Sequence, residues 1–175
     1  MTDDAIVPDT KDWTWVLRER CPECGLTSAD VDVRTLPAAI PVQATHWEAV
    51  LSRPEVRVRP APAVWSPLEY ACHVRDVYRL FDQRVHLMLD EDEPTFANWD
   101  QDETAVTGRY GEQDPATVAV ELREGAERIA ATFAQVPDDA WARRGFRSNG
   151  DDFTIETLAQ YMVHDVVHHL HDVRG

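Results

Sequence analysis

The chain has 175 residues, of which 17 are Lys or Arg and 32 are Asp or Glu, so its formal net charge is −15. A chain of this length buries roughly 70% of its unfolded surface in one core and needs no disulfide or structural metal merely to fold. The strong negative charge, without a basic stripe, argues against nucleic acid and anionic membranes as partners. No apolar run approaches the roughly 20 residues of a spanning helix, and the acidic start is unlike a signal peptide, so we expect a cytoplasmic protein.

Cysteine and arginine usage add two expectations. The three cysteines are an odd number, which fits a reducing compartment better than a disulfide framework. Lys11 is the single lysine, and every other basic residue is Arg. We interpret this bias as a sign of a GC-rich bacterial genome.

The chain divides into an irregular extension, residues 1–34, and a helical domain, residues 35–175. Proline, aspartate and the Cys-Pro-Glu-Cys-Gly stretch interrupt any periodicity in the extension. A first helix is expected from about Pro37 to Arg53, and an extended, proline-containing connection follows it to Val64.

Three further helices are expected. The second begins at Ser66-Pro67-Leu68-Glu69, which combines an N-cap serine, proline at the first position and a glutamate for a capping box, and it runs from 67 to about 89. The third lies between Asp114-Pro115 and Val136-Pro137, and the fourth runs from Thr154 to the C-terminus. The connections 90–113 and 138–153 are predicted to be irregular. The pattern predicts an all-α fold, a four-helix bundle with long connections.

Histidines are concentrated in the last predicted helix, which carries His164, His168, His169 and His171. His164 and His168 are four residues apart, so their side chains share one face, away from the aliphatic stripe of this helix. His73, in the second turn of the second helix, is placed to meet them inside a bundle. Three imidazoles leave a coordination position open for water or substrate, as in catalytic zinc sites. The spacing is compatible both with a metal site formed by His73, His164 and His168 and with histidines that only pack in the core or face solvent.

Two segments carry a family resemblance: Trp65-Ser-Pro-Leu-Glu-Tyr-Ala-Cys-His73-Val-Arg-Asp76 and His164-Asp-Val-Val-His168-His169-Leu-His-Asp-Val. Together they resemble the DinB-like superfamily of metal-binding four-helix bundles, which includes the metal-binding domain of mycothiol-dependent maleylpyruvate isomerases and the bacillithiol transferases. The resemblance covers residues 35–175. It implies one divalent metal, zinc or nickel, held by the three histidines, and dimerisation, which is common in the family.

A site of this kind activates a thiol, because a thiol that coordinates a metal is deprotonated. The resemblance therefore implies a transferase that moves a low-molecular-weight thiol onto a small electrophile, and the arginine bias favours mycothiol as the co-substrate. Asp172, four residues after His168, is placed to orient that imidazole. The alternatives are a metal-dependent hydrolase that activates a water molecule, and a metal-binding stress-response bundle without catalytic activity. No catalytic residue beyond the metal ligands is predicted.

Cys21 and Cys24 stand apart from these motifs. A Cys-Pro-x-Cys-Gly turn resembles half of a zinc ribbon or a rubredoxin knuckle, but a closed zinc site needs four ligands and the chain has no second cysteine pair. Cys72 or His46 would complete it only if the fold brought them near. A second zinc site, a redox pair and two ordinary reduced cysteines all stay open.

Overall fold

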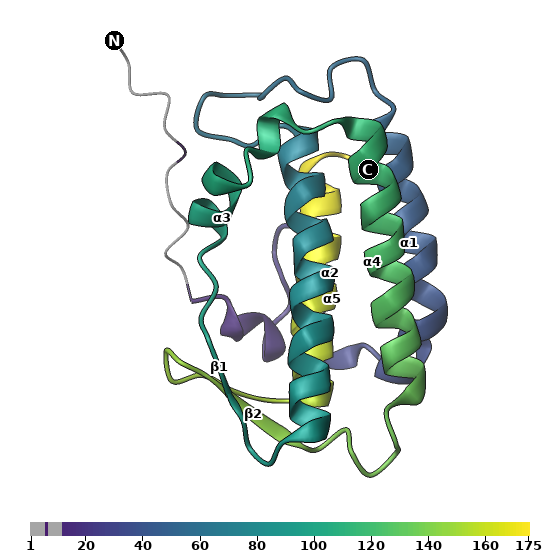
Figure 1. Ribbon diagram of the computed structural model, residues 1–175, viewed down its shortest axis with the longest axis vertical. Coiled ribbons are helices and arrows are strands. Elements are labelled where there is room, and N and C mark those ends of the chain that lie inside the picture. Colours follow the sequence, from purple (N-terminus) through teal and green to yellow (C-terminus); the bar gives the residue numbers. More distant parts are fainter. Residues whose placement is uncertain (1–5, 7–11) are drawn as a thin grey trace.

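The computed structural model describes residue 6 and residues 12–175. Its body is a bundle of four long helices (Figure 1), α1 (Leu36–Leu51), α2 (Pro67–Asp90), α4 (Pro115–Gln135) and α5 (Ile155–Asp172). Helix α4 packs against α1 and α2, and α2 also packs against α5. The predicted helical bundle is confirmed, with every boundary within two or three residues of its expected place.

The start of α2 follows from its sequence. Ser66 accepts a hydrogen bond from the backbone N–H of Glu69 through its side chain, and the Glu69 carboxylate accepts one from the backbone N–H of Ser66. Each side chain thus satisfies a donor that the first helical turn leaves unpaired. This reciprocal box fixes the first turns of α2, and His73 lies in the second of them.

The two long connections are more ordered than their composition predicts. They contain a short helix, α3 (Gln101–Thr107), and three short strands, β1 (Thr95–Phe96), β2 (Arg144–Arg147) and β3 (Asp152–Thr154). Strand β2 pairs parallel to β1 and antiparallel to β3. Phe96 and Phe153 are buried within these strands, so the small sheet is anchored by side chains from segments far apart in sequence. Such strands are too short for the alternation that identifies a strand.

The segment before α1 lies along α5 rather than apart from the bundle. It contains three 3-10 turns, η1 (Thr14–Leu17), η2 (Ser28–Asp30) and η3 (Val33–Thr35), and all three contact α5. Val16 and Cys21 are buried there, with at most 1% of either exposed. The first part of the described chain therefore covers one side of the helix that carries the histidine cluster.

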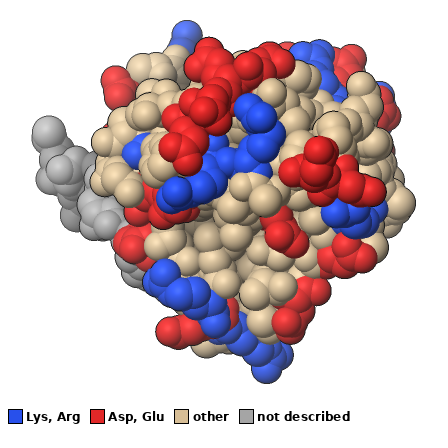
Figure 2. Space-filling view, turned by 90° about the horizontal axis from the view of Figure 1, so that it is seen from below, with Lys and Arg blue, Asp and Glu red and all other residues tan. Residues whose placement is uncertain are grey.

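The face drawn in Figure 2 mixes both signs of charge. In Figure 2 the basic side chains lie next to acidic ones and form no continuous positive face. Ion pairs such as Arg144 with Asp152 and Arg34 with Asp138 account for this mixing. Among the described helices, none has the length and apolar character that crossing a membrane requires.

Candidate metal centre

Helix α5 carries two pairs of metal-binding side chains at a spacing of four residues. One pair is His164 and His168, and the other is Asp165 and His169, one position further along. Successive positions differ by about 100° around a helix, so the two pairs project in different directions. The structure gives each pair different neighbours.

The pair Asp165 and His169 meets His73 of α2. The three ligand atoms lie within 4.8 Å of one another. His73 Nε2 is 3.1 Å from Asp165 Oδ1, and His169 Nε2 is 3.7 Å from the same oxygen. Two ligands bound to one tetrahedral ion at about 2.0–2.2 Å stand roughly 3.4 Å apart, so these separations suit a shared divalent ion.

Charge and packing prepare these three side chains. Burial would raise the pKa of Asp165, but the neighbouring His73, His169 and His164 outweigh it and hold this pKa at about 2. The carboxylate is therefore ionised at neutral pH. His169 Nδ1 lies 2.9 Å from Asp172 Oδ2, a contact that leaves Nε2 directed toward Asp165. The Trp99 ring stacks on the fully buried His73 at a centroid distance of 5.2 Å.

The other pair, His164 and His168, lies against the N-terminal segment, by which we mean the described residues that precede α1. His164 and His168 lie with Cys21 and Cys24, and the four ligand atoms are also within 4.8 Å of one another. Burial, followed by the charge of His168, lowers the pKa of His164 to about 4, so its imidazole is neutral at pH 7. All three cysteines of the chain are free thiols in this structure.

The predicted triad is thus divided between two neighbouring groups. Among the described residues, no group of adjacent ligand atoms contains His73 together with His164 and His168. As a metal site this triad stays a prediction, whereas His73 with Asp165 and His169 is the group that the geometry assembles. Cys72 and His46 do not lie with Cys21 and Cys24, and Asp172 approaches His169 more closely than His168.

Two signals in the sequence point to these groups. Asp165 and His169 have the same four-residue spacing as His164 and His168, and carboxylates are common metal ligands beside imidazole. The spacing Cys-x2-Cys with His-x3-His also falls within the ligand pattern of Cys2His2 zinc sites. Both signals are missed when only histidines are taken as candidates for the first site and only Cys72 or His46 is considered beside the two cysteines.

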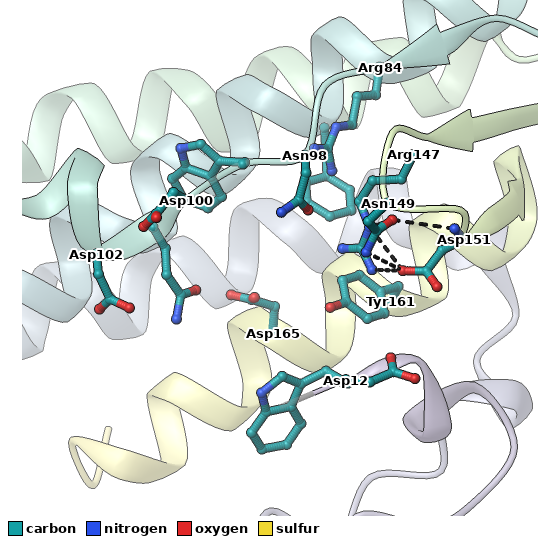
Figure 3. A pocket seen from close by; sticks show the side chains of 14 residues that line it. Asp12, Arg84, Asn98, Asp100, Asp102, Arg147, Asn149, Asp151, Tyr161 and Asp165 are labelled. Atoms are coloured by element: carbon teal, nitrogen blue, oxygen red, sulfur yellow. Dashed lines mark hydrogen bonds and ion pairs between the residues drawn. The ribbon is translucent and has the colours of Figure 1, made fainter. Parts of the chain in front are cut away.

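A cavity of about 480 Å³ lies beside the group of His73, Asp165 and His169. In Figure 3, Asp165 projects toward it from α5, while Arg84 and Arg147 lie at its other side. Arg147 donates to Asp151, and Asn149 donates to the same carboxylate. The rings of the lining come from four side chains: Trp13, Phe81, Trp99 and Tyr161. The cavity thus combines aromatic faces with charged and amide groups.

Fold and site together define a class: a helical bundle whose second and last long helices direct metal-binding side chains to one point. The sequence model of the DinB superfamily matches residues 43–173, so the chain belongs to the DinB superfamily. The structure is similar to YfiT from Bacillus subtilis, described as a probable metal-dependent hydrolase with an unusual four-helix bundle topology. That similarity has a TM-score of 0.68 at 18% identity and covers 79% of this chain and 81% of YfiT. A comparison with curated proteins found no match.

The donors fit the divalent metal that this family implies. Asp165 is ionised, His73 Nε2 and His169 Nε2 both face its carboxylate, and His169 is oriented by a second carboxylate. Two imidazoles and one carboxylate form a ligand set that is frequent at catalytic metal sites. Because Asp165 also lines the cavity, a ligand in the cavity has access to this group.

Proposed function

We propose that the protein is a divalent-metal-dependent transferase that adds a low-molecular-weight thiol of the mycothiol type to a small electrophile. His73, Asp165 and His169 hold the metal in this proposal, which keeps one of the three expected ligands and replaces two. The observation that carries it is the cavity to which Asp165 is exposed, with its mixture of rings, carboxylates, amides and guanidinium groups.

The lining suits a co-substrate that carries sugar hydroxyls. Carboxylates and amides bind hydroxyl groups in pairs, and aromatic rings pack on the apolar faces of sugars. Trp99 and Trp13 supply such rings beside the metal ligands, and Asn98 and Asp100 supply polar groups.

A metal at this site supplies Lewis-acid chemistry that favours the thiolate form of a thiol brought next to it. The chain's own residues orient the two substrates and hold them in contact. Addition to an epoxide balances without another reagent: a sulfur–carbon bond forms, the carbon–oxygen bond opens and the thiol proton ends on that oxygen. Addition to an activated double bond balances in the same way, with the proton ending on carbon.

The second candidate is a metal-dependent hydrolase. It is favoured by the carboxylates Asp100 and Asp102, which line the same cavity and are candidates for a general base. This candidate requires turnover of an ester, amide or epoxide in the absence of any thiol.

The test measures consumption of an epoxide or activated alkene by the zinc-loaded or nickel-loaded protein, with mycothiol and without it. We expect turnover that requires the thiol and falls about 100-fold or more in Asp165→Asn and His169→Ala, because a lost ligand costs at least as much as a lost outer contact. His171→Ala is the matched control, since this neighbour on α5 has a side chain that is 55% exposed. Equal turnover with and without the thiol would show that the protein is a hydrolase and not a thiol transferase. Activity that is unchanged in Asp165→Asn would refute the proposed set of metal ligands.

A further inference from the structure

We propose that Cys21, Cys24, His164 and His168 form a second metal site, a closed structural zinc site that fastens the N-terminal segment to α5. It is separate from the group of His73, Asp165 and His169 and stands whether or not the chain is a transferase.

The separations match tetrahedral zinc. All four ligand atoms lie within 4.8 Å of one another, and Cys21 Sγ is 3.6 Å from His168 Nδ1. A zinc–sulfur bond of about 2.3 Å and a zinc–nitrogen bond of about 2.05 Å at a tetrahedral angle place the two donors about 3.6 Å apart. The observed contact has this length before any adjustment of the side chains.

The two cysteines lie on a tight turn that directs both toward α5. The Gly25 N–H donates to the Cys21 carbonyl oxygen at 2.9 Å, and the Cys21 N–H donates to the Leu26 carbonyl oxygen at 2.8 Å. Gly25 has a φ of +77°, a conformation that glycine adopts without the penalty of a Cβ. The backbone conformation of the turn therefore favours glycine at position 25, directly after Cys24.

The two histidines have ring nitrogens that are available as metal ligands. His164 is 4% exposed, and its Nε2 is buried without a hydrogen-bond partner among the residues that the structure describes. His168 faces Cys21 with Nδ1, while its Nε2 lies 3.4 Å from a Glu23 carboxylate oxygen. A carboxylate at the second nitrogen is the common outer partner of a metal-bound imidazole.

The donor chemistry selects zinc and a structural role. Two thiolates and two imidazoles complete the four ligands of zinc and leave no position for a substrate. Two thiolate charges also balance a divalent ion, so the site is neutral overall. Neutrality matters because Cys21, His164 and His168 are buried, where an uncompensated charge is costly.

The site has a consequence for the cavity. The Trp13 ring lies 5.9 Å from the His164 ring and 5.3 Å from the His168 ring, measured between centroids, and Trp13 also lines the large cavity. A smaller space of about 70 Å³, lined by these three side chains together with Asp165 and His169, lies between the two groups. Zinc bound to the four side chains would hold Trp13 in place as one wall of the cavity.

The experiment replaces the metal of the full-length protein with Co²⁺, which reports sulfur ligation by a thiolate-to-cobalt charge-transfer band in the near ultraviolet. We expect this band in the wild type, and we expect Cys21→Ser/Cys24→Ser to lose both the band and one of the bound zinc ions. Cys72→Ser is the matched control because Cys72 is buried on α2 outside this cluster, and it should retain band and zinc. His169→Ala should retain the band as well, which separates this site from the proposed catalytic one.

A second measurement keeps the proposal testable if the double variant does not fold. In the folded wild type, Cys21 and Cys24 should react with a thiol-specific reagent only after a strong chelator has removed the metal. The proposal is overturned if the wild type shows no charge-transfer band, or if the band persists in the folded double variant. It is also overturned if protein purified under reducing, metal-replete conditions contains a Cys21–Cys24 disulfide, since the pair would then be a redox couple.

Discussion

Arg84 is a buried charged residue that takes no part in the proposed metal site. It is 5% exposed, and its Nε has no hydrogen-bond partner among the described residues, although another guanidinium nitrogen donates to the Ala97 carbonyl oxygen at 3.0 Å. Burial and the nearby Arg147 lower the pKa of Arg84 to about 10, which still leaves it charged at neutral pH. A buried cation at the side of a cavity is suited to bind an anionic group of a ligand.

We therefore expect Arg84→Gln to raise KM for a carboxylate-bearing substrate by about 10- to 100-fold with little change in kcat. The magnitude follows from the roughly 1.5–3 kcal/mol of a hydrogen bond to a charged group. Arg144→Gln is the control, because Arg144 lies outside the cavity and pairs with Asp152. Kinetics that change equally in both variants would show that Arg84 contributes only general charge.

Prediction from the sequence was least complete for the individual residues of the site. His73 is predicted as a ligand because a capping box fixes its helical position and the four-residue spacing makes the last helix a metal candidate. Asp165 and His169 were not among the predicted ligands because a helical pattern alone does not say which of two adjacent faces meets α2. That choice depends on how α5 is rotated in the bundle, which is decided by packing across the core.

At the scale of the element, the start of α2 shows how one side chain supports a site it does not touch. Glu69 is 5% exposed; its carboxylate accepts from the Ser66 N–H at 2.8 Å and from Arg59 Nε at 3.0 Å. Burial raises its pKa, but the hydrogen bonds from Arg59 and Ser66 outweigh burial and leave the pKa below its ordinary value. Its contribution to stability is therefore present at neutral pH and disappears as the pH falls through the lowered pKa.

Glu69→Gln should lower the free energy of unfolding by about 1–3 kcal/mol at pH 7, the cost of weakening a buried charged network. The difference from wild type should shrink at pH 3, where the wild-type carboxylate also begins to take up a proton. Urea unfolding at both pH values measures it. Glu112→Gln, which disrupts an ion pair of exposed side chains, should leave the urea midpoint unchanged. A Glu69 effect of equal size at both pH values would contradict the linkage.

Helices that begin with strong capping residues were predicted well. The short strands, which have no such local signal, were not predicted. Ser66-Pro67 and Asp114-Pro115 located two helix starts because capping is a local interaction. The small sheet was not predicted because its pairing joins residues 95–96 to residues 146–147, far away along the chain. Its strands have only two to four residues each, so tertiary contacts rather than local preference determine them.

At the scale of the molecule, α5 connects two candidate metal sites of different character. One group is formed with α2 and borders the cavity, and the other is formed with the N-terminal segment and would be closed once zinc is bound. The division explains why so many histidines stand in one helix: the spacing is used twice, once on each of two adjacent faces. Trp13 packs on the second group and lines the cavity, so the N-terminal segment links them.

Native mass spectrometry of the zinc-loaded, full-length chain tests this division most directly, because it counts the ions bound to each folded molecule. We expect two zinc ions in the wild type, one in His169→Ala and one in Cys21→Ser/Cys24→Ser, with none left when these substitutions are combined. A single ion that is lost on substitution of His73, His164 or His168 and retained in His169→Ala would contradict it and would restore the three-histidine site expected from the sequence.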